Sequence, residues 1–456
     1  MNYLIELAYL AASVLFVLGL KGLSHPETAK RGMHMAEAGM LLAVVGTLMH
    51  HEIVSYTWII AGLLLGSTIG GAMAYWVPMT AMPQRTALSH AFGALAATLV
   101  GVAEFHHQGA GLGTFKMTAV SLEVFLGALT TTGSLLAFAK LQELLPGKPL
   151  TYGGQNVLNL GILAGILGLF VYQAITLDAG PWFYVMTGLA AAFGVLLVLP
   201  IGAADMPVVM SLLNSYAGLA AAATGFAIDN KVLIIAGTLD GFSGFILSVL
   251  MCKAMNRSIT NVLFGAFGST TTAVAAGPQG EAREVSVDDV AVQLAYARLV
   301  VFVPGYGMAT AQAQTAVREL AKTLEERGVA VKYAIHPVAG RMPGHMNVLL
   351  AEANVPYSDL YELEQINPEF PDTDVAVVIG ANDVVNPDAR DNPQSPIAGM
   401  PILEVDRARS VVVLKRGKGK GFAGIENPLF FKPATGMLYG DAKDSLTKLV
   451  QAVKAT

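Results

Sequence analysis

The sequence predicts a polytopic α-helical membrane bundle of about nine spans, followed by a soluble α/β doubly wound domain. Three observations support this fold class. Only 13% of the 456 residues are charged and 54% are hydrophobic, whereas an average soluble domain is about 25% charged. The charges are unevenly placed, with 21 in residues 1–260 and 40 in residues 261–456. After residue 285 the long apolar runs give way to short strands separated by amphipathic helices.

We therefore expect a transmembrane domain over residues 1–260, a linker over 261–285 and a soluble domain over 286–456. Within the first part, nine apolar stretches approach the roughly 20 residues that a bilayer-spanning helix needs. They cover residues 3–20, 33–49, 53–76, 87–103, 117–139, 155–175, 182–199, 207–228 and 232–251.

Lysines and arginines in the loops predict the orientation, because they accumulate on the cytoplasmic side of a membrane. Eight lie in one alternating set of loops and two, Lys116 and Lys231, lie in the other. We therefore expect the N-terminus outside and the C-terminal domain in the cytoplasm. The eight are Lys21, Lys30, Arg31, Arg85, Lys140, Lys148, Lys253 and Arg257.

Four polar residues in the spans are candidates for a proton path, because polar groups are expensive in hydrocarbon. His90, Glu123 and Asn214 lie inside the fourth, fifth and eighth spans, and Asp205 lies at the mouth of the eighth. Histidine titrates near neutral pH, which makes His90 the leading candidate. The alternative is that His90 and Asn214 only join helices by hydrogen bonds. Small residues from Gly218 to Gly225 predict close packing around the eighth span.

The soluble part begins with a capped helix and a strand–turn–helix–strand unit. Residues 286–289 read Ser-Val-Asp-Asp and are expected to cap a short helix that reaches residue 297. A buried strand over 299–303 is followed by Gly305, Gly307 and Thr310 in a Gly-x-Gly-x-x-Thr turn, then by a helix to residue 327 and a strand over 329–335. This order is typical of Rossmann-like dinucleotide sites. The alternative is a tight turn without a ligand.

The second strand and a later basic loop favour NADP over NAD. The second strand ends at His336 and Pro337, where a NAD site usually has an acidic residue for the ribose hydroxyl. After a strand over 411–414, residues 415–421 read Lys-Arg-Gly-Lys-Gly-Lys-Gly. Such a loop can surround a phosphate while Arg416 binds it with a planar fork. The alternative is a solvated basic loop.

Two further loops are expected to belong to the same site. A strand over 375–379 ends at Gly380, and doubly wound folds bind ligands at the carboxyl ends of strands. Residues 338–345 form a glycine-bearing loop in which Arg341 is available for a phosphate.

At these segments the chain resembles the beta subunit of the proton-translocating NAD(P) transhydrogenase. The resemblance covers nearly the whole chain, and the joint order of the motifs is specific although each motif alone is not. The motifs are residues 204–209, 213–216, 251–258, 304–309, 336–346, 380–383, 415–416 and 426–431.

The resemblance implies that this chain binds NADP(H), while a separate alpha subunit of one or two polypeptides binds NAD(H). It places the family's membrane histidine on His90 and the family's membrane asparagine on Asn214. It places Asp383 near the nicotinamide. Arg257 and residues 265–277 are expected to couple the two domains. With the turn and loops described above, it gives this set of cofactor-binding residues: Gly305, Tyr306, Gly307, Met308, Ala309, His336, Val338, Ala339, Gly340, Arg341, Met342, Pro343, Gly380, Ala381, Asn382, Asp383, Val384, Gly399, Met400, Lys415, Arg416, Gly417, Lys418, Gly419, Lys420, Gly421, Phe422, Asp441 and Ala442.

Two positions depart from the family's pattern. Many relatives carry Tyr where this chain has Phe422, so any bond from that hydroxyl to the cofactor is missing here, whereas packing of the ring can remain. Thr310 replaces a small apolar residue at the third fingerprint position. The resemblance implies hydride transfer between NADH and NADP, coupled to inward proton flow. It also implies a homodimer of alpha–beta units in a bacterial inner membrane.

The alternative from another class is a transporter or channel with a nucleotide-sensing cytoplasmic domain, which predicts an ion pathway and no hydride transfer. The net charge of −5 gives no electrostatic case for a nucleic-acid partner. The single cysteine, Cys252, excludes a cysteine-cluster metal site, and we expect no metal.

Overall fold

The computed structural model describes residues 2–49, 55–146, 149–177, 180–202, 205–264, 281–395, 397–417, 419, 421 and 423–456. Its contacts divide the chain into two compact units, Met1–Gly202 with Val209–Ser248, and Ala203–Val208 with Val249–Thr456. We call them the helical unit and the sheet unit. Most of the predicted linker over 261–285 lies outside the described residues, so the predicted domain boundaries stay predictions.

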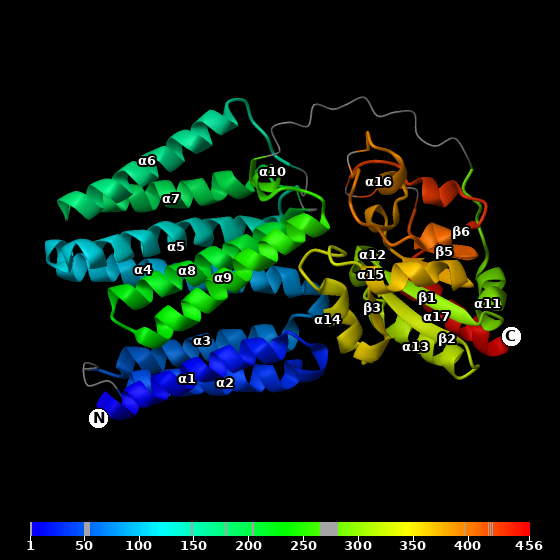
Figure 1. Cartoon of the computed structure of the whole chain (residues 1–456), viewed down its shortest axis with the longest axis horizontal. Coiled ribbons are helices and arrows are strands. Elements are labelled where there is room, and N and C mark those ends of the chain that lie inside the picture. Colours follow the sequence, from blue (N-terminus) through cyan, green and yellow to red (C-terminus); the bar gives the residue numbers. More distant parts are fainter. Residues whose placement is uncertain are drawn as a thin grey trace. The chain divides into compact units, whose positions relative to one another are not determined.

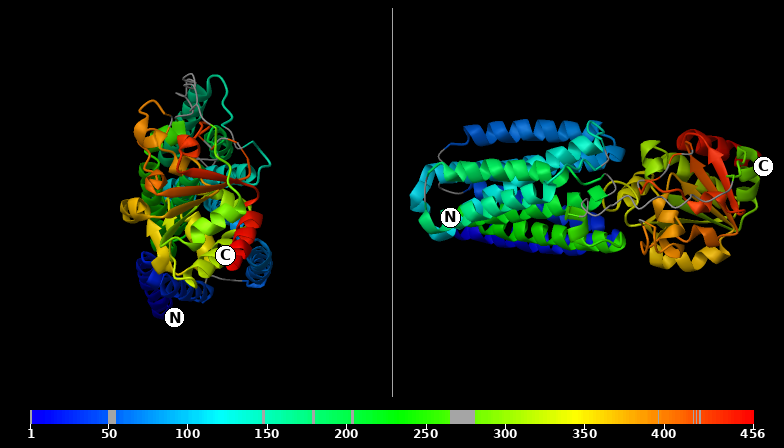
Figure 2. Two further views of the ribbon diagram at one scale, coloured as in Figure 1. Left: turned by 90° about the vertical axis from the view of Figure 1, so that its right-hand side faces the viewer. Right: turned by 90° about the horizontal axis from the view of Figure 1, so that it is seen from above.

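Each predicted apolar stretch corresponds to one long helix of the described chain. Figures 1 and 2 show these helices aligned along one direction. They are α1 (Asn2–Leu23), α2 (Pro26–Leu48), α3 (Thr57–Trp76), α4 (Met82–Gln108), α5 (Gly113–Leu141), α6 (Gln155–Thr176), α7 (Trp182–Val198), α8 (Met206–Ala227) and α9 (Lys231–Ala254).

Seven of these helices are long and apolar enough to cross a membrane. The remaining two are α7, which has only 17 residues, and α2, whose 23 residues include four charged side chains. The apolar outer surface of the unit agrees with a membrane location, since α3 has no buried residue at all. The helical part of the predicted fold class is therefore confirmed.

Helices α8 and α9 approach each other closely because glycines line both sides of their contact. A Cβ atom added to Gly218 would lie 2.4 Å from the backbone nitrogen of Gly241, and one added to Gly237 would lie 2.4 Å from that of Ala222. The Ser215 hydroxyl donates to the Gly241 carbonyl at 2.7 Å. The small residues of the eighth span therefore pack closely, as predicted.

Lys140 does not lie in a loop, although the count of loop lysines and arginines included it. It lies in the last turn of α5 and is fully buried. Its ammonium donates to the carbonyls of Val198, the last residue of α7, at 3.2 Å and of Ile201, just after that helix, at 2.8 Å. Lys140 therefore satisfies the free carbonyls at a helix C-terminus and is not a solvated loop cation, which removes one of the eight charges from the orientation argument.

The sheet unit is built on six parallel strands in the order β3-β2-β1-β4-β5-β6. This is the strand order of doubly wound dinucleotide-binding folds, so the predicted fold class is confirmed here too. The strands are β1 (Leu299–Pro304), β2 (Ala330–Ile335), β3 (Leu360–Glu362), β4 (Val375–Ile379), β5 (Ser410–Lys415) and β6 (Thr435–Tyr439).

Helices and loops cover both faces of this sheet, because its strands are buried on both sides. Alternate strand residues such as Val301, Val378 and Val413 point to one face and pack with Phe370 and Leu403. Figure 1 shows α11, α13 and α17 grouped on one side of the sheet. The helices after α9 are α10 (Ile259–Phe264), α11 (Val287–Ala295), α12 (Tyr306–Thr310), α13 (Gln314–Glu325), α14 (His345–Glu352), α15 (Leu363–Ile366), α16 (Asp388–Asp391) and α17 (Ala442–Ala455).

Helix α11 begins where its sequence predicted. The Ser286 hydroxyl accepts from the backbone N–H of Asp289, and the Asp289 carboxylate accepts from the backbone N–H of Ser286. This reciprocal pair is a capping box. The helix ends at Ala295, two residues before the predicted end.

Candidate functional site

The predicted nucleotide loops meet at the carboxyl edge of the sheet. Strands β1 and β4 are neighbours at the point where the strand order reverses, and ligands bind there in open α/β sheets. The backbone N–H of Gly305 donates to the Ile379 carbonyl at 2.9 Å, and that of Gly307 donates to the Gly380 carbonyl at 2.9 Å. The loops that follow the two strands are therefore in direct backbone contact.

This contact explains why Gly305 and Gly307 must lack side chains. A Cβ atom at Gly305 would lie 2.5 Å from the Cα of Ala381, and one at Gly307 would lie 2.6 Å from the Cα of Gly380. Gly305 has φ −129°, which any residue adopts. The glycines are thus required for close approach of two backbones and not for a left-handed turn.

The predicted helix to residue 327 is shorter than expected and is preceded by a separate turn of helix. Residues Tyr306–Thr310 form α12, and the longer helix α13 runs only from Gln314 to Glu325. Between them Gln312 adopts a left-handed conformation with φ 49°, which interrupts the helix. The side chain of Thr310, at the third fingerprint position, donates to the Gly307 carbonyl at 3.0 Å. Met308 and Ala309 are buried and face the core.

The loop after β2 packs against α12 and is held by two histidines. The Arg341 guanidinium lies over the Tyr306 ring, 4.4 Å from its centroid. The backbone N–H of Arg341 donates to Nδ1 of His345 at 3.2 Å. Gly340, with φ 108°, gives this loop its turn, and a Cβ there would lie 2.5 Å from the His345 ring. Val338, Ala339, Met342 and Pro343 belong to the same loop.

His336 fixes the start of this loop to the connection between β4 and β5. Its Nδ1 accepts from the backbone N–H of Val338 at 3.2 Å, so Nε2 carries the proton and donates to the Pro401 carbonyl at 2.8 Å. Burial lowers the pKa of His336 to about 4, which keeps the ring neutral at physiological pH. His336 is therefore a structural link beside the predicted contacts Gly399 and Met400, and both of its ring nitrogens have partners within the chain.

The basic loop after β5 lies against the loop after β4. The Asp383 carboxylate accepts from the backbone N–H of Ala423 at 2.9 Å, and a Cβ at Gly421 would collide with the same carboxylate. Lys415 donates to the Gly419 carbonyl and lies 4.8 Å from the centre of the Phe430 ring. Burial lowers the pKa of Lys415, and the Asp383 carboxylate opposes this shift. Arg416 is exposed; Lys418, Lys420 and Phe422 lie outside the described residues.

Asparagine side chains complete the β4 loop, and sequence reasoning assigned them no role. Asn427 is buried, and its Nδ2 donates to the backbone carbonyl of Asn382 at 3.0 Å. Asn386 donates to the Glu426 carbonyl at 3.3 Å. The signal in the sequence was an asparagine, Asn427, directly before the apolar run Pro-Leu-Phe-Phe. Val384 lies in this loop as well.

The last predicted contacts, Asp441 and Ala442, begin helix α17 at the carboxyl end of β6. The Asp441 carboxylate accepts from the backbone N–H groups of Lys443 at 2.9 Å and Asp444 at 3.3 Å. Asp441 is thus the N-cap of α17. All five strands from which contacts were predicted end at the same edge of the sheet, because all the strands are parallel.

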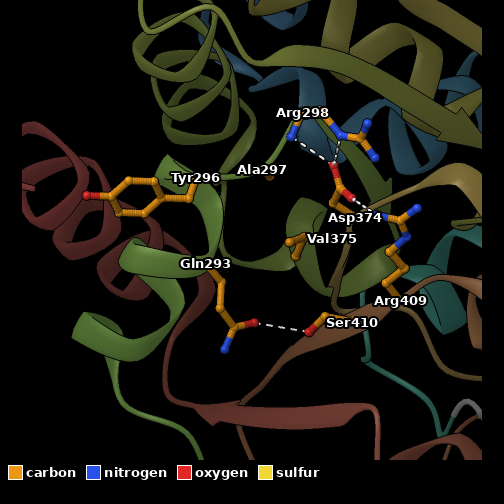
Figure 3. Close-up of a pocket in the computed structure, with 8 residues that line it drawn as sticks. All are labelled: Gln293, Tyr296, Ala297, Arg298, Asp374, Val375, Arg409 and Ser410. Carbon is orange, nitrogen blue, oxygen red and sulfur yellow. Dashed lines mark hydrogen bonds and ion pairs between the residues drawn. The ribbon is translucent and has the colours of Figure 1, made fainter.

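A hollow of about 570 Å³ lies at the opposite edge of the sheet. Figure 3 shows Arg298, Asp374 and Arg409 at its wall, next to the amino ends of β1, β4 and β5. Asp374 is already satisfied there, since it accepts from Arg409 at 2.9 Å and from the backbone N–H of Arg298 at 2.8 Å. These bonds and both arginines lower the pKa of Asp374. The hollow is therefore separate from the nucleotide loops.

In the helical unit, Asn214 of α8 lies close to the His90 side chain of α4. The Nδ2 of Asn214 donates to Oδ1 of Asp240 on α9 at 3.0 Å. The structure thus brings together the two predicted residues and adds an acid that the sequence analysis did not single out. Asp240 was detectable by the rule that selected Glu123, since it is an acid inside an apolar span.

Glu123 lies apart from this group. It is fully buried on α5, and its Oε1 accepts from the Thr224 hydroxyl at 2.7 Å. A Cβ at Gly101 would lie 3.2 Å from its Oε2. Gly101 follows His90 by eleven residues on α4, which is about 16 Å along a helix. The polar residues of the helical unit therefore form two separate groups, one around His90 and one around Glu123.

Asp205 forms an ion pair with Arg257. The guanidinium Nη1 lies 2.7 and 2.6 Å from the two carboxylate oxygens. Burial raises the pKa of Asp205, and the Arg257 charge opposes this shift. The pair joins the start of α8 to the segment after α9. Residues 265–277, predicted to couple the domains with Arg257, lie outside the described residues.

Comparisons with known proteins agree with this geometry. Residues 5–452 match the family described as the NAD(P) transhydrogenase beta subunit. The chain is 50% identical over 456 residues to the NAD(P) transhydrogenase subunit beta of Rhodospirillum rubrum, with 98% of each chain covered. The identity and coverage are the same for the NAD(P) transhydrogenase subunit beta of a particular strain of Rhodospirillum rubrum. The chain therefore belongs to the NAD(P) transhydrogenase beta subunit family.

Proposed function

We propose that this chain binds NADP(H) across the carboxyl edge of its sheet and couples hydride transfer from NADH, held on an alpha subunit, to inward proton movement. One observation carries the nucleotide site. The loops after β1 and β4 meet at the point where the strand order reverses, and Gly305 and Gly307 allow backbone contact there. That arrangement is what a dinucleotide site of this fold requires.

The residues at this edge fit a nucleotide with an extra phosphate. Lys415 and the exposed Arg416 stand on the loop after β5, and Arg341 stands on the loop after β2. Arginine and lysine bind phosphates by charge-assisted hydrogen bonds. Strand β2 ends at the neutral, buried His336 and not at a carboxylate that would repel a phosphate on the ribose. These features support NADP(H) over NAD(H) on this chain.

The nucleotide, when bound, supplies hydride chemistry, and the protein supplies orientation and exclusion of water. Asp383 contributes to orientation, because its carboxylate holds the backbone of Ala423 and so closes the β5 loop against the β4 loop. We place Asp383 next to the nicotinamide end of the site. The alpha subunit brings the NADH to the same face.

His90 is proposed as the proton carrier of the helical unit. An imidazole can take up and release a proton near neutral pH, and Asn214 can orient it without carrying charge. A charge that crosses a potential of 100 mV supplies about 2.3 kcal/mol, which shifts a hydride equilibrium more than tenfold. Coupling then requires that protonation of His90 changes the affinity for NADP(H), by linkage. Glu123 and Asp205 are further proposed stations, and Arg257 is proposed to take part in coupling.

We propose a homodimer of alpha–beta units in a bacterial inner membrane, with the N-terminus outside and the sheet unit in the cytoplasm. The asymmetry of loop charges supports this orientation even without Lys140. Reporter proteins fused after residue 175 and after residue 276 test it, because three spans separate the two positions. They should report opposite sides of the membrane, and the same side for both would show that a span was miscounted.

Loss of the cations on the β5 loop tests the nucleotide site. In the detergent-solubilised full chain, Lys415→Ala with Arg416→Ala should weaken NADPH binding at least tenfold by calorimetry, since each charge-assisted contact contributes about 1.5–3 kcal/mol. A control that removes two exposed cations elsewhere, Lys322→Ala with Lys448→Ala, should bind normally. Unchanged affinity in the first variant would refute the assignment.

The rival function, a nucleotide-gated transporter, is distinguished by chemistry. Vesicles that contain both subunits should reduce NADP⁺ with NADH, and an uncoupler should change the rate. A transporter would move ions on nucleotide binding and transfer no hydride.

A further inference from the structure

Asp240 places a carboxylate in the middle of an apolar helix. It is nine residues from the first residue of α9 and fourteen from the last, which is about 13 and 21 Å along the helix. A side chain as short as aspartate cannot reach the membrane surface from there. Acids at such positions are paired or functional, because hydrocarbon does not solvate a charge.

The partner of Asp240 is the amide of Asn214, and two glycines make room for the pair. The Nδ2 of Asn214 donates to Oδ1 of Asp240 at 3.0 Å. A Cβ at Gly218 would lie 2.9 Å from Oδ2 of Asp240, and one at Gly244 would lie 3.0 Å from Nδ2 of Asn214. Any larger residue at either glycine would obstruct this contact.

The carboxylate fixes which way the Asn214 amide points. A carboxylate only accepts hydrogen bonds, so the NH₂ group of Asn214 must face Asp240 and its carbonyl oxygen must face away. Asn214 also lies close to the His90 ring. The amide oxygen is then the acceptor for an imidazole N–H, and an imidazolium is the form of histidine that always donates.

We propose that Asp240 is a positioning residue for His90, which orients the Asn214 amide toward the imidazole and provides the negative charge that balances His90 when it is protonated. The transported proton is carried by His90. This inference rests on the proposed role of His90 as proton carrier.

Other charged groups near His90 in the described chain lie farther along the helices. Arg85 precedes His90 by five residues on α4, about 7 Å along the axis. Glu123 of α5 contacts Gly101 and Thr224, about 16 Å along α4 from His90. Asn214 and Tyr216 of α8 are neutral. Asp240 of α9 is the acid that contacts Asn214, the neighbour of His90.

The pH dependence of proton pumping tests the inference. Inverted vesicles with both subunits are assayed for acidification during NADPH oxidation, with rates normalised to NADPH-binding sites. Asp240→Asn keeps a hydrogen-bond acceptor but removes the charge, so protonation of His90 should need a lower pH. We expect the pH of half-maximal pumping to fall by about one unit or more, while NADPH binding is unchanged.

Two variants separate charge from structure. Asp240→Glu retains the charge and should keep the midpoint close to that of the original chain. Asp229→Asn is the matched control, since this exposed acid follows α8 and pairs with Lys116 at 2.6 Å; its midpoint should not move. If Asp240→Asn does not assemble, Asp240→Ser is assayed in its place with the same expected shift.

Some results would overturn the inference. An unchanged midpoint in the neutral variants refutes it while leaving the role of His90 intact, and so does a lower rate at every pH without a shift, which is the signature of a merely structural group. Normal pumping by His90→Asn refutes the proposed function and this inference together.

Discussion

The two sites of this chain are constructed in opposite ways. In the helical unit the site consists of side chains, since His90, Asn214 and Asp240 come from three helices whose backbones are already satisfied. In the sheet unit the site consists mainly of backbone, since the loops after β1 and β4 meet where Gly305 and Gly307 have no side chains. A side-chain site can therefore lose function with its fold intact, whereas a backbone site loses both together.

The largest loss of NADPH binding should come from the addition of a single methyl group in the backbone site. In Gly305→Ala the new Cβ would lie 2.5 Å from the Cα of Ala381, and overpacking of this kind costs about 1–3 kcal/mol or more. We expect NADPH binding to be lost in calorimetry on the full chain.

The matched control is Gly153→Ala, because a Cβ at Gly153 meets no atom within 4 Å. It should bind NADPH normally. If Gly305→Ala also binds normally, the two backbones do not need their close approach, and the contrast between the two sites disappears.

His336 sharpens the comparison, because it is a side chain that holds the backbone site together. Its pKa is about 4 in the folded chain, below the usual 6.5. The contribution of neutral His336 to the free energy of unfolding is complete above pH 6.5 and is lost as the pH falls toward 4. Between pH 7.5 and pH 5 the loss is about 2 kcal/mol.

Urea unfolding of the detergent-solubilised chain, followed by near-ultraviolet circular dichroism, measures this loss. His336→Gln cannot titrate, so the stability difference between the original chain and the variant should shrink by that amount as the pH falls. A difference that is the same at both pH values would mean that His336 is not held neutral.

Sequence reasoning was most successful where a periodic pattern continues over many residues. The apolar runs gave all nine long helices, and the strands over 375–379 and 411–414 appear as β4 and β5, because strand and helix periods are local properties. The predicted helix to residue 327 was wrong in its bounds, since the left-handed Gln312 that interrupts it is set by packing. The topology could be predicted from the alternation of strands and helices, but the contact of Gly305 with Ala381 could not.

The same limit applied in the helical unit. The expense of polar groups in hydrocarbon identifies His90, Asn214 and Glu123 from the sequence alone. It does not say which of them meet, because that depends on the rotation of each helix. The contacts of Asn214 with Asp240 and of Glu123 with Thr224 therefore arise from the close packing of α4, α5, α8 and α9. No sequence motif indicates them. Lys140 was misassigned for the same reason, since a cation at a helix end can face solvent or a neighbouring helix.

The central claim is that protonation of a side chain in the helical unit changes the nucleotide affinity of a site made mainly of backbone. The most direct test is acidification of inverted vesicles that contain both subunits, during NADPH oxidation, for the original chain and for His90→Asn. Asparagine keeps a polar hydrogen bond but cannot titrate. The account predicts that this variant binds NADPH normally and does not acidify the vesicles. Acidification at the normal rate would contradict it and would make Glu123 or Asp205 the next candidate.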